Sequence, residues 1–273
     1  MNIAFQGEPG AYSEAAVLEH FSSQQAAVPC ETFERVFESV VSGECERGLI
    51  PIENSLAGSI HRNYDLLLQN NLAVVGEHYL HVHHCLIALP GVELREIRRV
   101  ISHPQALAQC DGYIRSLGGV KAEAAYDTAG SVKIVQGQGD HSLGAIASRR
   151  AAELYGMQVL AENIEDNAAN ITRFLIISCD PLDPGSDAKT SIVFSLKNEP
   201  GSLFKALSVF ALRDIDLTKI ESRPLVGKPW EYFFYIDFAG STRQEVVGRA
   251  LSHLGEYATH LRVLGSYPRN RLP

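Results

Sequence analysis

The sequence predicts an α/β protein that is followed by a smaller ferredoxin-like module, and three patterns carry this prediction. Up to about residue 178, short apolar segments alternate with amphipathic segments, which is the βα repeat of α/β sheets. Residues 178–189 (SCDPLDPGSDAK) are rich in Pro, Asp, Ser and Gly, as linkers are. From residue 190 the order becomes strand, helix, strand, strand, helix, strand, which is the ferredoxin-like arrangement.

Composition and charge exclude several classes of protein. The chain has 273 residues, of which 45% are hydrophobic and 21% charged, which is typical of soluble globular proteins. The net charge of −8, without a basic run, argues against nucleic acid or an anionic membrane as the main partner. No apolar run is long enough to span a bilayer. Residues 1–5 already have the pattern of a strand, so we expect no targeting peptide and a cytoplasmic location.

The cysteines and the histidine cluster do not make a strong case for a metal site. The five cysteines are scattered, odd in number and without a CxxC pair: Cys30, Cys45, Cys85, Cys110 and Cys179. This pattern favours reduced thiols over a disulfide frame or zinc site. His81, His83 and His84 lie close together, but a lone histidine pair is more often packed or solvated than metal-bound. We predict no metal and leave the role of these histidines open.

The first elements follow from apolar periodicity and from the residues that start helices. A strand at 2–6 leads into GEPGAYSE at 7–14 and a helix at about 13–20. The glycines let the backbone approach a ligand, and a helix start attracts negative charge. A second helix at 32–42 has its apolar residues on one face: Phe33, Val36, Phe37, Val40 and Val41.

The following elements repeat this order, with polar residues where strands give way to helices. We predict strands at 48–52, 73–79, 85–89, 100–101, 121–125, 142–147 and 159–162. We predict helices at 64–69, at 106–117, from within 126–131 to 135, and at 149–155, the last capped by Ser148. Ligands of α/β sheets bind at the carboxyl ends of strands. Several helix N-termini at one cleft suit a substrate with more than one carboxylate, although ordinary capping explains the same residues.

A polar segment precedes the last strand of this first part. Four apolar residues at 174–177 predict a buried strand, and Asn170, Ile171, Thr172 and Arg173 stand directly before them. Because side chains alternate along a strand, Asn170 and Thr172 share one face and Arg173 takes the other. The candidates at other strand exits are Asn54, Ser55, Ser102, Gln105, Thr128 and Ser148, with Tyr12 and Ser13 as weaker ones.

The second part carries its own pattern. Strands are predicted at 190–196, 217–222, 231–238 and 260–265, and helices at 201–213 and 242–254. Leu203, Leu207 and Phe210 form one stripe of the first of these helices. A small module of this kind suits a regulatory domain, although a fold alone proves no function.

Several motifs, in this order, resemble the prephenate dehydratase family with a C-terminal ACT regulatory domain. They are GEPGAYSE at 7–14, PIENS at 51–55, SHPQALAQC at 102–110, YDTAGS at 126–131, AIAS at 145–148, NITRF at 170–174, NEPGSLFKAL at 198–207 and ESRP at 221–224. The segments IHRNYDLLL at 60–68 and LRVLGSYP at 261–268 resemble the subgroup that includes plant arogenate dehydratases. The resemblance covers nearly the whole chain.

This resemblance implies a fold and a division into domains. It implies a catalytic domain at 1–178, a linker at 179–189 and an ACT domain at 190–273. The catalytic region is expected to have two lobes, as in type II periplasmic binding proteins. One lobe comprises about 1–80 with 159–178, and the other about 81–160.

The resemblance also implies an activity and its residues. The family converts prephenate to phenylpyruvate, CO2 and water in phenylalanine biosynthesis, without a cofactor, and is inhibited by L-phenylalanine. The essential threonine corresponds to Thr172, which we expect to donate a hydrogen bond to the departing hydroxyl. Arg173 pairs with a substrate carboxylate or holds the strand, and the residues give no preference between the two. Phe174, the last residue of the motif, is expected to bind the substrate.

The ACT motifs imply an L-phenylalanine site and an assembly. The expected effector-binding residues are Asn198, Pro200, Gly201, Ser202, Leu203, Phe204, Glu221, Ser222, Arg223 and Pro224. A homodimer or homotetramer through the ACT domains is expected. Two other functions stay open: an arogenate dehydratase, and a non-catalytic amino-acid sensor. No mutase-like segment or dehydrogenase fingerprint is present, so a monofunctional enzyme is expected.

Overall fold

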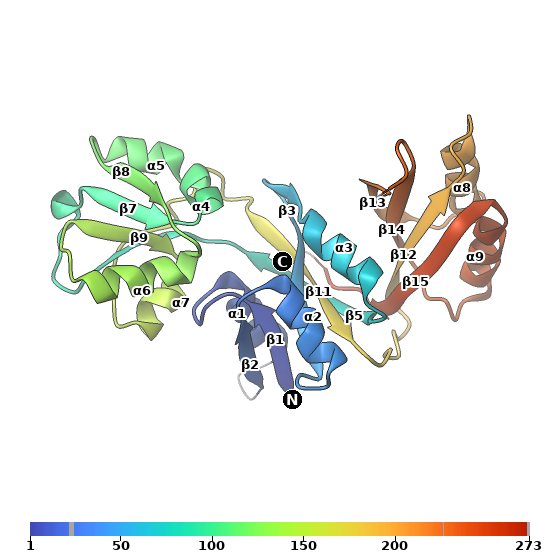
Figure 1. Ribbon diagram of the computed structural model, residues 1–273, viewed down its shortest axis with the longest axis horizontal. Coiled ribbons are helices and arrows are strands. Elements are labelled where there is room, and N and C mark those ends of the chain that lie inside the picture. The colour runs from blue at the N-terminus through green and yellow to red at the C-terminus, as the bar shows by residue number, and fades with distance from the viewer. Residues whose placement is uncertain (22–24, 226, 272–273) are drawn as a thin grey trace. The chain divides into compact units, whose positions relative to one another are not determined.

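The computed structural model describes residues 1–21, 25–225 and 227–271. Within these ranges the chain forms three β-sheets, which Figure 1 shows with their helices. The strands of the first sheet are β1 (Asn2–Gln6), β2 (Ala26–Cys30), β3 (Arg47–Asn54), β4 (Gly58–Ser59), β5 (Ala73–His81) and β11 (Ile171–Ser178). Their order is β2-β1-β3-β11-β5, with β4 paired to β3.

Strand β2 was not predicted, and its sequence explains why. It contains Pro29, which lacks the N–H that a central strand needs. β2 lies at the edge of the sheet and pairs in parallel with β1 alone, so the proline costs no central hydrogen bond. Helix α1 (Tyr12–Phe21) packs Ala16 and Val17 against Ile3 and Phe5 of β1.

Helix α2 (Phe33–Val41) begins after Thr32, whose side chain accepts a hydrogen bond from the Arg35 N–H. Val36, Phe37 and Val40 are buried, as the periodicity predicts. Val41 is exposed, because it lies at the last turn of the helix and off the apolar stripe.

The second sheet comprises β6 (Cys85–Ala88), β7 (Arg99–Ser102), β8 (Lys121–Ala124), β9 (Leu143–Ala147) and β10 (Gln158–Glu162), in the order β10-β6-β9-β7-β8. β7 pairs in parallel with β8 and β9, whereas β6 pairs antiparallel with β9 and β10. The chain passes from the first sheet to the second after β5 and returns before β11. This double passage gives two α/β lobes. Residues 159–162 were predicted in the first lobe, but they belong to β10 of the second sheet, where they pair with β6.

Helices cover both faces of the second sheet (Figure 1). On one face lie α4 (Pro104–Gln109) and α5 (Asp111–Ser116); on the other lie α6 (Thr128–Gln138) and α7 (Arg149–Leu154). A short 3-10 helix, η1 (Leu94–Glu96), precedes β7. The predicted single helix at 106–117 is wrong: Cys110 has φ −118° and ψ 18°, so it ends α4 and starts α5.

The third sheet has the predicted ferredoxin-like order. Its elements are β12 (Ala188–Leu196), α8 (Ser202–Ala211), β13 (Leu217–Pro224), β14 (Tyr232–Ala239), α9 (Glu245–Tyr257) and β15 (Ala258–Pro268). The strand order is β13-β14-β12-β15, with β12 antiparallel to β14 and to β15. Val209 and Phe210 of α8 and Leu254 of α9 are buried in one cluster with Phe194 and Ile236 of the sheet.

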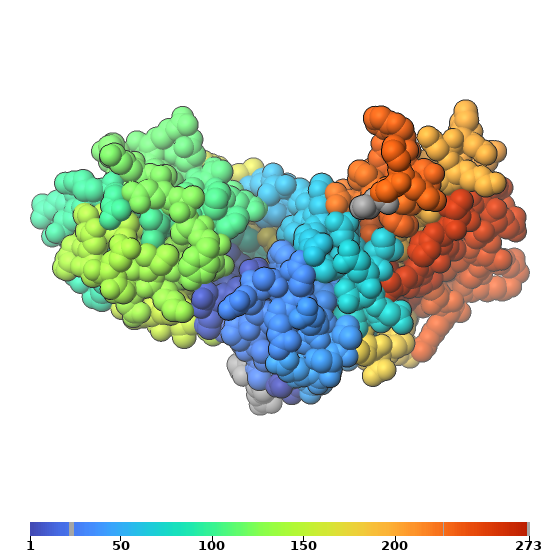
Figure 2. Space-filling model, viewed as in Figure 1, coloured from blue at the N-terminus to red at the C-terminus, as the bar shows by residue number. Residues whose placement is uncertain are grey.

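Helix α3 (His61–Gln69) packs against the third sheet, although it lies far from that sheet in the sequence. The Tyr235 hydroxyl donates to the Tyr64 carbonyl at 3.0 Å, and the two rings meet edge to face. Figure 2 shows α3 (cyan) beside the orange and red surface of β13 and β15. The helix starts at His61, three residues before the predicted start.

By internal contacts the described chain forms two compact units. The first comprises Met1–Ile60 and His78–Phe174, and the second comprises His61–Glu77 and Leu175–Arg271. The active-site candidates all lie in the first unit, and the effector-site candidates all lie in the second.

Candidate active site

The first compact unit contains a cavity of about 160 Å³ that elements of both of its sheets line. The first residues of α1, α4 and α6 line it, together with the end of β3 and the start of β11. Its lining residues are Tyr12, Ser13, Pro51, Asn54, Ile60, Val82, His84, His103, Gln105, Ala106, Gln109, Thr128, Thr172 and Phe174. Because helix N-termini carry partial positive charge, this wall favours anionic groups.

Asn54 fixes the direction of the Thr172 hydroxyl. The Asn54 Oδ1 accepts hydrogen bonds from the backbone N–H groups of Leu56 and Ala57, each at 3.0 Å. Backbone N–H groups can only donate, so the other end of the amide must be the NH₂ group. That group donates to the Thr172 Oγ1 at 3.0 Å and to the Asn170 Oδ1 at 2.7 Å. The Thr172 oxygen is therefore an acceptor here, and its own proton is available to a group in the cavity.

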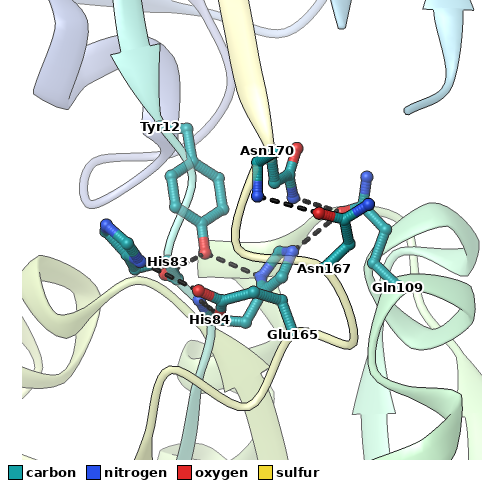
Figure 3. A network of polar contacts seen from close by, with 8 residues as sticks. Tyr12, His83, His84, Gln109, Glu165, Asn167 and Asn170 are labelled. Atoms are coloured by element: carbon teal, nitrogen blue, oxygen red, sulfur yellow. Dashed lines mark hydrogen bonds and ion pairs between the residues drawn. The ribbon is translucent and has the colours of Figure 1, made fainter. Parts of the chain in front are cut away.

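A chain of polar contacts continues from Asn170 to Tyr12 (Figure 3). The Asn170 Nδ2 donates to the Gln109 Oε1 at 3.1 Å, and the His84 Nε2 lies 2.9 Å from the same oxygen. The His84 Nδ1 lies 2.8 Å from the Tyr12 hydroxyl, which is also 2.9 Å from the His83 carbonyl. Side chains from α1, α4 and the strand-connecting segments thus form one network.

Burial sets the charge of this network. His84 is 2% exposed, and burial lowers the pKa of its imidazole, although Gln109 and Glu165 act in the opposite direction. Burial also raises the pKa of the Tyr12 phenol. Glu165 accepts from the His84 backbone N–H at 2.9 Å and pairs with the His83 ring at 2.8 Å. At neutral pH, His84 and Tyr12 are therefore both uncharged.

The structure brings together about half of the residues predicted for the active site. Asn54, Gln105, Thr128, Thr172 and Phe174 line the cavity, and so do the weaker candidates Tyr12 and Ser13. Asn170 is fully buried and reaches the site through its bonds to Asn54 and Gln109. Strand alternation predicts that Asn170 and Thr172 share one face, and in the structure both bind the amide of Asn54.

The hydroxyls of the three predicted serines have backbone partners. The Ser55 hydroxyl donates to the Ala169 carbonyl at 2.6 Å, and that of Ser102 to the Ile146 carbonyl at 2.6 Å. Ser148 caps α7, as predicted, and its hydroxyl also donates to the Gly10 carbonyl at 2.7 Å. Arg173 is buried on the strand face opposite Thr172 and lies outside the described lining of the cavity. A substrate role for these four residues stays a prediction.

Sequence reasoning missed His84, His103 and Gln109 as cavity residues. Gln109 lies four residues after Gln105, so the two share one helix face, and this spacing was a usable signal. His84 was weighed only as a metal ligand. In the structure it faces Tyr12 and Gln109, which no sequence pattern indicates.

The second compact unit has a cavity of about 110 Å³ beside α8. Of the predicted effector residues, Asn198, Ser202 and Leu203 line it, next to Trp230 and Tyr232. Gly201 starts α8 with φ 80°, a conformation that favours glycine.

The other predicted effector residues do not line this cavity in the described part of the chain. Phe204 is 77% exposed. Glu221 and Arg223 face α3, where they pair with His61 at 3.3 Å and with Asp65 at 3.0 Å. Pro200, Ser222 and Pro224 are also absent from the described lining, and effector binding stays a prediction for all of the predicted residues.

The described residues contain neither a metal-binding cluster nor a membrane-spanning helix. Within residues 1–21, 25–225 and 227–271, no group of three or more His, Cys, Asp or Glu side chains is placed to hold a metal ion. Over the same ranges, no helix is long and apolar enough to cross a membrane.

Comparison with protein families decides the membership of this chain. The family model for prephenate dehydratase matches residues 3–181, and the model for the ACT domain matches residues 190–254. The chain belongs to the prephenate dehydratase family. A similar curated relative is arogenate dehydratase/prephenate dehydratase 2, chloroplastic, of Arabidopsis thaliana. It is 51% identical over 279 residues, which cover 98% of this chain and 73% of the relative.

Two solved structures share the fold over nearly the whole chain. One is a prephenate dehydratase in complex with L-Phe from Arthrobacter aurescens, with 32% identity, a TM-score of 0.91 and coverage of 98% of this chain and 90% of that one. The other is GqqA, described as a novel type of quorum quenching acylase, with 37% identity, a TM-score of 0.91 and coverage of 99% and 98%. The predicted fold class is confirmed. This member of the prephenate dehydratase family is a dehydratase of the prephenate/arogenate type in phenylalanine biosynthesis.

Proposed function

We propose that this enzyme converts prephenate to phenylpyruvate, CO2 and water, with Thr172 as the catalytic donor. The observation that carries the proposal is the geometry of Thr172 in the cavity. Its oxygen accepts from Asn54 at 3.0 Å, so its proton is available to a bound substrate. Asn54, Gln105, Thr128 and Phe174 are the proposed substrate-binding residues that line the same space.

The reaction needs assistance mainly at its leaving hydroxyl. The C–C bond to the ring carboxylate breaks and releases CO2, and its electron pair forms the new ring double bond. The C–O bond breaks on the other side of the ring, and the hydroxyl takes up a proton as it leaves, which gives water. A hydrogen bond from Thr172 would stabilise the negative charge that develops on this oxygen. Because threonine is a weak acid, proton transfer must accompany C–O cleavage.

Helix N-termini supply the complementary charge for the two substrate carboxylates. Tyr12 and Ser13 belong to the first turn of α1, and Thr128 is the first residue of α6. Partial charges of this kind attract a carboxylate less strongly than an arginine pair does. Such an arrangement suits a reaction in which one carboxylate must leave as neutral CO2.

The test is to replace Thr172 and assay both candidate substrates. Thr172→Ala should lower kcat by about 10²–10³, the loss typical of one donor on developing charge. Thr172→Ser retains the hydroxyl and should keep more of the activity. Near-normal turnover by Thr172→Ala, with the fold intact by circular dichroism, would remove Thr172 from the mechanism.

Arogenate is the second candidate substrate, because the similar Arabidopsis protein carries both names. Arogenate has an amine where prephenate has a keto group, and a site that hydrogen-bonds one group can strongly reject the other. Parallel measurements of kcat/KM with prephenate and arogenate decide between them. A ratio above one for prephenate supports our proposal, and a ratio below one supports the alternative.

We propose that L-phenylalanine binds beside α8 and inhibits the enzyme. Asn198, Ser202 and Leu203 line a cavity there with aromatic neighbours, and a similar dehydratase has been solved with L-Phe. We expect calorimetry to show L-Phe binding that Ser202→Trp abolishes by filling the cavity. An absence of binding to the unmodified enzyme would remove the regulatory proposal and leave the catalytic one intact.

We also propose a homodimer or homotetramer built through the ACT domains. Strands β13 and β15 are the edges of the described third sheet, and Ile220 on β13 is 49% exposed. An edge strand offers unpaired backbone groups to a second copy. The proposed domain bounds are 1–178 for the catalytic domain and 190–273 for the ACT domain, joined by 179–189. Sedimentation equilibrium of the whole chain tests the assembly.

A further inference from the structure

The polar network of the active site has a direction, and His84 within it has no part in the function proposed above. We propose that His84 and Tyr12 are positioning residues that hold Gln109, Asn170 and Asn54 in the orientation that points the Thr172 proton into the cavity. The inference rests on the proposed role of Thr172 as donor. It assigns to His84 a specific tautomer, with its proton on Nε2 and a lone pair on Nδ1.

The direction of the network is set at Asn54. The backbone N–H groups of Leu56 and Ala57 force its Oδ1 to be the acceptor, so its Nδ2 must donate. The orientation of the Asn170 amide is then fixed as well. Asn170 accepts through Oδ1 at 2.7 Å, and it must donate through Nδ2 to Gln109 at 3.1 Å.

The same reasoning extends to His84, because His84 and Asn170 share one hydrogen-bond acceptor. The Gln109 Oε1 already accepts from Asn170, and the His84 Nε2 lies 2.9 Å from the same oxygen. Two lone pairs at that distance repel each other, so Nε2 must carry a proton. A neutral imidazole has one N–H, so Nδ1 must then accept. The single proton of the Tyr12 hydroxyl is shared between this Nδ1 at 2.8 Å and the His83 carbonyl at 2.9 Å.

Because His84 and Asn170 are buried, the other tautomer of His84 would disrupt the network. His84 is 2% exposed and Asn170 is fully buried, so water does not readily replace a lost partner of either side chain. With the His84 proton on Nδ1, Gln109 would face a lone pair and would have to turn its amide. Its NH₂ group would then face the NH₂ group of Asn170, and Asn170 would lose its acceptor. The damage would reach Asn54, which holds Thr172.

Burial lowers the pKa of the His84 ring, whereas the nearby Glu165 carboxylate raises it. The Tyr12 ring packs on it edge to face, with a centroid distance of 5.4 Å. Glu165 bonds to its backbone N–H, while the neighbouring His83 ring takes the other carboxylate oxygen. The buried thiols of Cys85 and Cys110 have raised pKa values because of burial, so they are uncharged at neutral pH.

Three substitutions test the proposal by activity. His84→Leu removes the donor to Gln109, and His84→Gln offers an amide N–H in its place. Tyr12→Phe removes the donor to Nδ1 but retains the ring. We expect His84→Leu to lower kcat by on the order of 10², the cost of misplacing a reacting group by about 1 Å, with KM near the unmodified value. His84→Gln should recover most of the loss, and Tyr12→Phe should lie between the two.

The control applies the same chemical change at the exposed His141, where His141→Leu should leave kcat unchanged. Folding of each variant is checked by its thermal unfolding midpoint. Full activity of His84→Leu in a folded protein would overturn the proposal. So would a His84→Gln variant as impaired as His84→Leu.

A second measurement does not depend on activity, and for the unmodified enzyme it does not depend on any variant's folding. In ¹⁵N-labelled unmodified enzyme at neutral pH, NMR should show a pyrrole-like Nε2 and a pyridine-like Nδ1 for His84. Tyr12→Phe should weaken this preference, whereas a merely structural tyrosine would leave it unchanged. A proton on Nδ1 would overturn the assignment. If the unmodified enzyme turned over neither prephenate nor arogenate, the proposed function would be wrong. The NMR result would still decide the tautomer of His84, because it does not depend on turnover.

Discussion

Asn54 makes a different kind of contact with each end of its amide group. The oxygen binds two backbone N–H groups of its own turn, and the nitrogen binds Asn170 and Thr172, which lie more than a hundred residues away in the sequence. A local turn therefore orients a side chain that orients a remote hydroxyl. By contrast, the hydroxyls of Ser55, Ser102 and Ser148 each donate to a backbone carbonyl.

Asn54→Asp tests this two-ended role. The carboxylate retains the acceptor for Leu56 and Ala57 but has no proton for Asn170 or Thr172. Thr172 would then donate to the introduced carboxylate instead of to the substrate, so we expect kcat to fall by about 10²–10³. The measurement is steady-state kinetics with prephenate, next to Asn54→Ala. Unchanged turnover by Asn54→Asp would show that the amide does not set the direction of the hydroxyl.

Helix α3 is held against the third sheet by residues that lie far from it in the sequence. Arg262 of β15 donates to backbone carbonyls at and beyond the end of this helix: Leu67 at 3.2 Å, Leu68 at 3.3 Å, Asn70 at 2.8 Å and Leu72 at 3.2 Å. A cation at a helix C-terminus satisfies unpaired carbonyls and complements the helix dipole. Arg223 and Glu221 bind the same helix through Asp65 and His61.

Arg262→Ala should destabilise the protein more than the loss of a surface charge does. Hydrogen bonds to charged groups contribute about 1.5–3 kcal/mol, and four carbonyls lose their partner together. We expect the free energy of unfolding in urea to fall by about that amount. Arg249→Ala breaks an exposed pair with Glu245 within α9 and should cost only about 0.3–0.5 kcal/mol. Equal effects of the two substitutions would contradict a special role for Arg262.

For the whole molecule, the titration of three histidines makes the free energy of unfolding depend on pH. Burial lowers the pKa values of His20, His78 and His84 below the ordinary 6.5, and the first two also repel each other when charged. These three histidines therefore become protonated at a higher pH in the unfolded chain than in the folded one. The contribution of these histidines to stability is then complete above about pH 6.5 and decreases as the pH falls from there toward the folded pKa values.

We expect the urea midpoint of unfolding to decrease between pH 7.5 and pH 5.5. Asp127, whose pKa burial raises above 3.8, acts in the opposite direction but in a more acidic range. His78→Gln should reduce the pH dependence, and His141→Gln at an exposed position should not. A midpoint that stays constant over this range would show that the histidines have equal pKa values in both states.

The sequence by itself was sufficient for the fold class, for most elements and for part of the lining of the candidate cavity. Apolar periodicity is a local property, so β1, α2 and the strand–helix order of the ACT module followed directly from it. The break at Cys110 and the edge strand β2 did not, because neither has a strong local signal. Thr172, Asn54, Gln105 and Thr128 were found because polar residues at strand exits and family motifs both mark them.

Only the tertiary structure decided which polar side chains meet. Alternation along β11 placed Asn170 and Thr172 on one face, but it could not show that both bind the amide of Asn54. His84 and Tyr12 belong to segments about seventy residues apart, and no periodicity relates them. Hydrogen bonds between remote segments depend on how whole sheets and helices pack, and packing is a property of the complete chain. The sequence therefore determined which polar side chains are present. The tertiary structure determined which of them bind one another, and so which atoms donate and which accept.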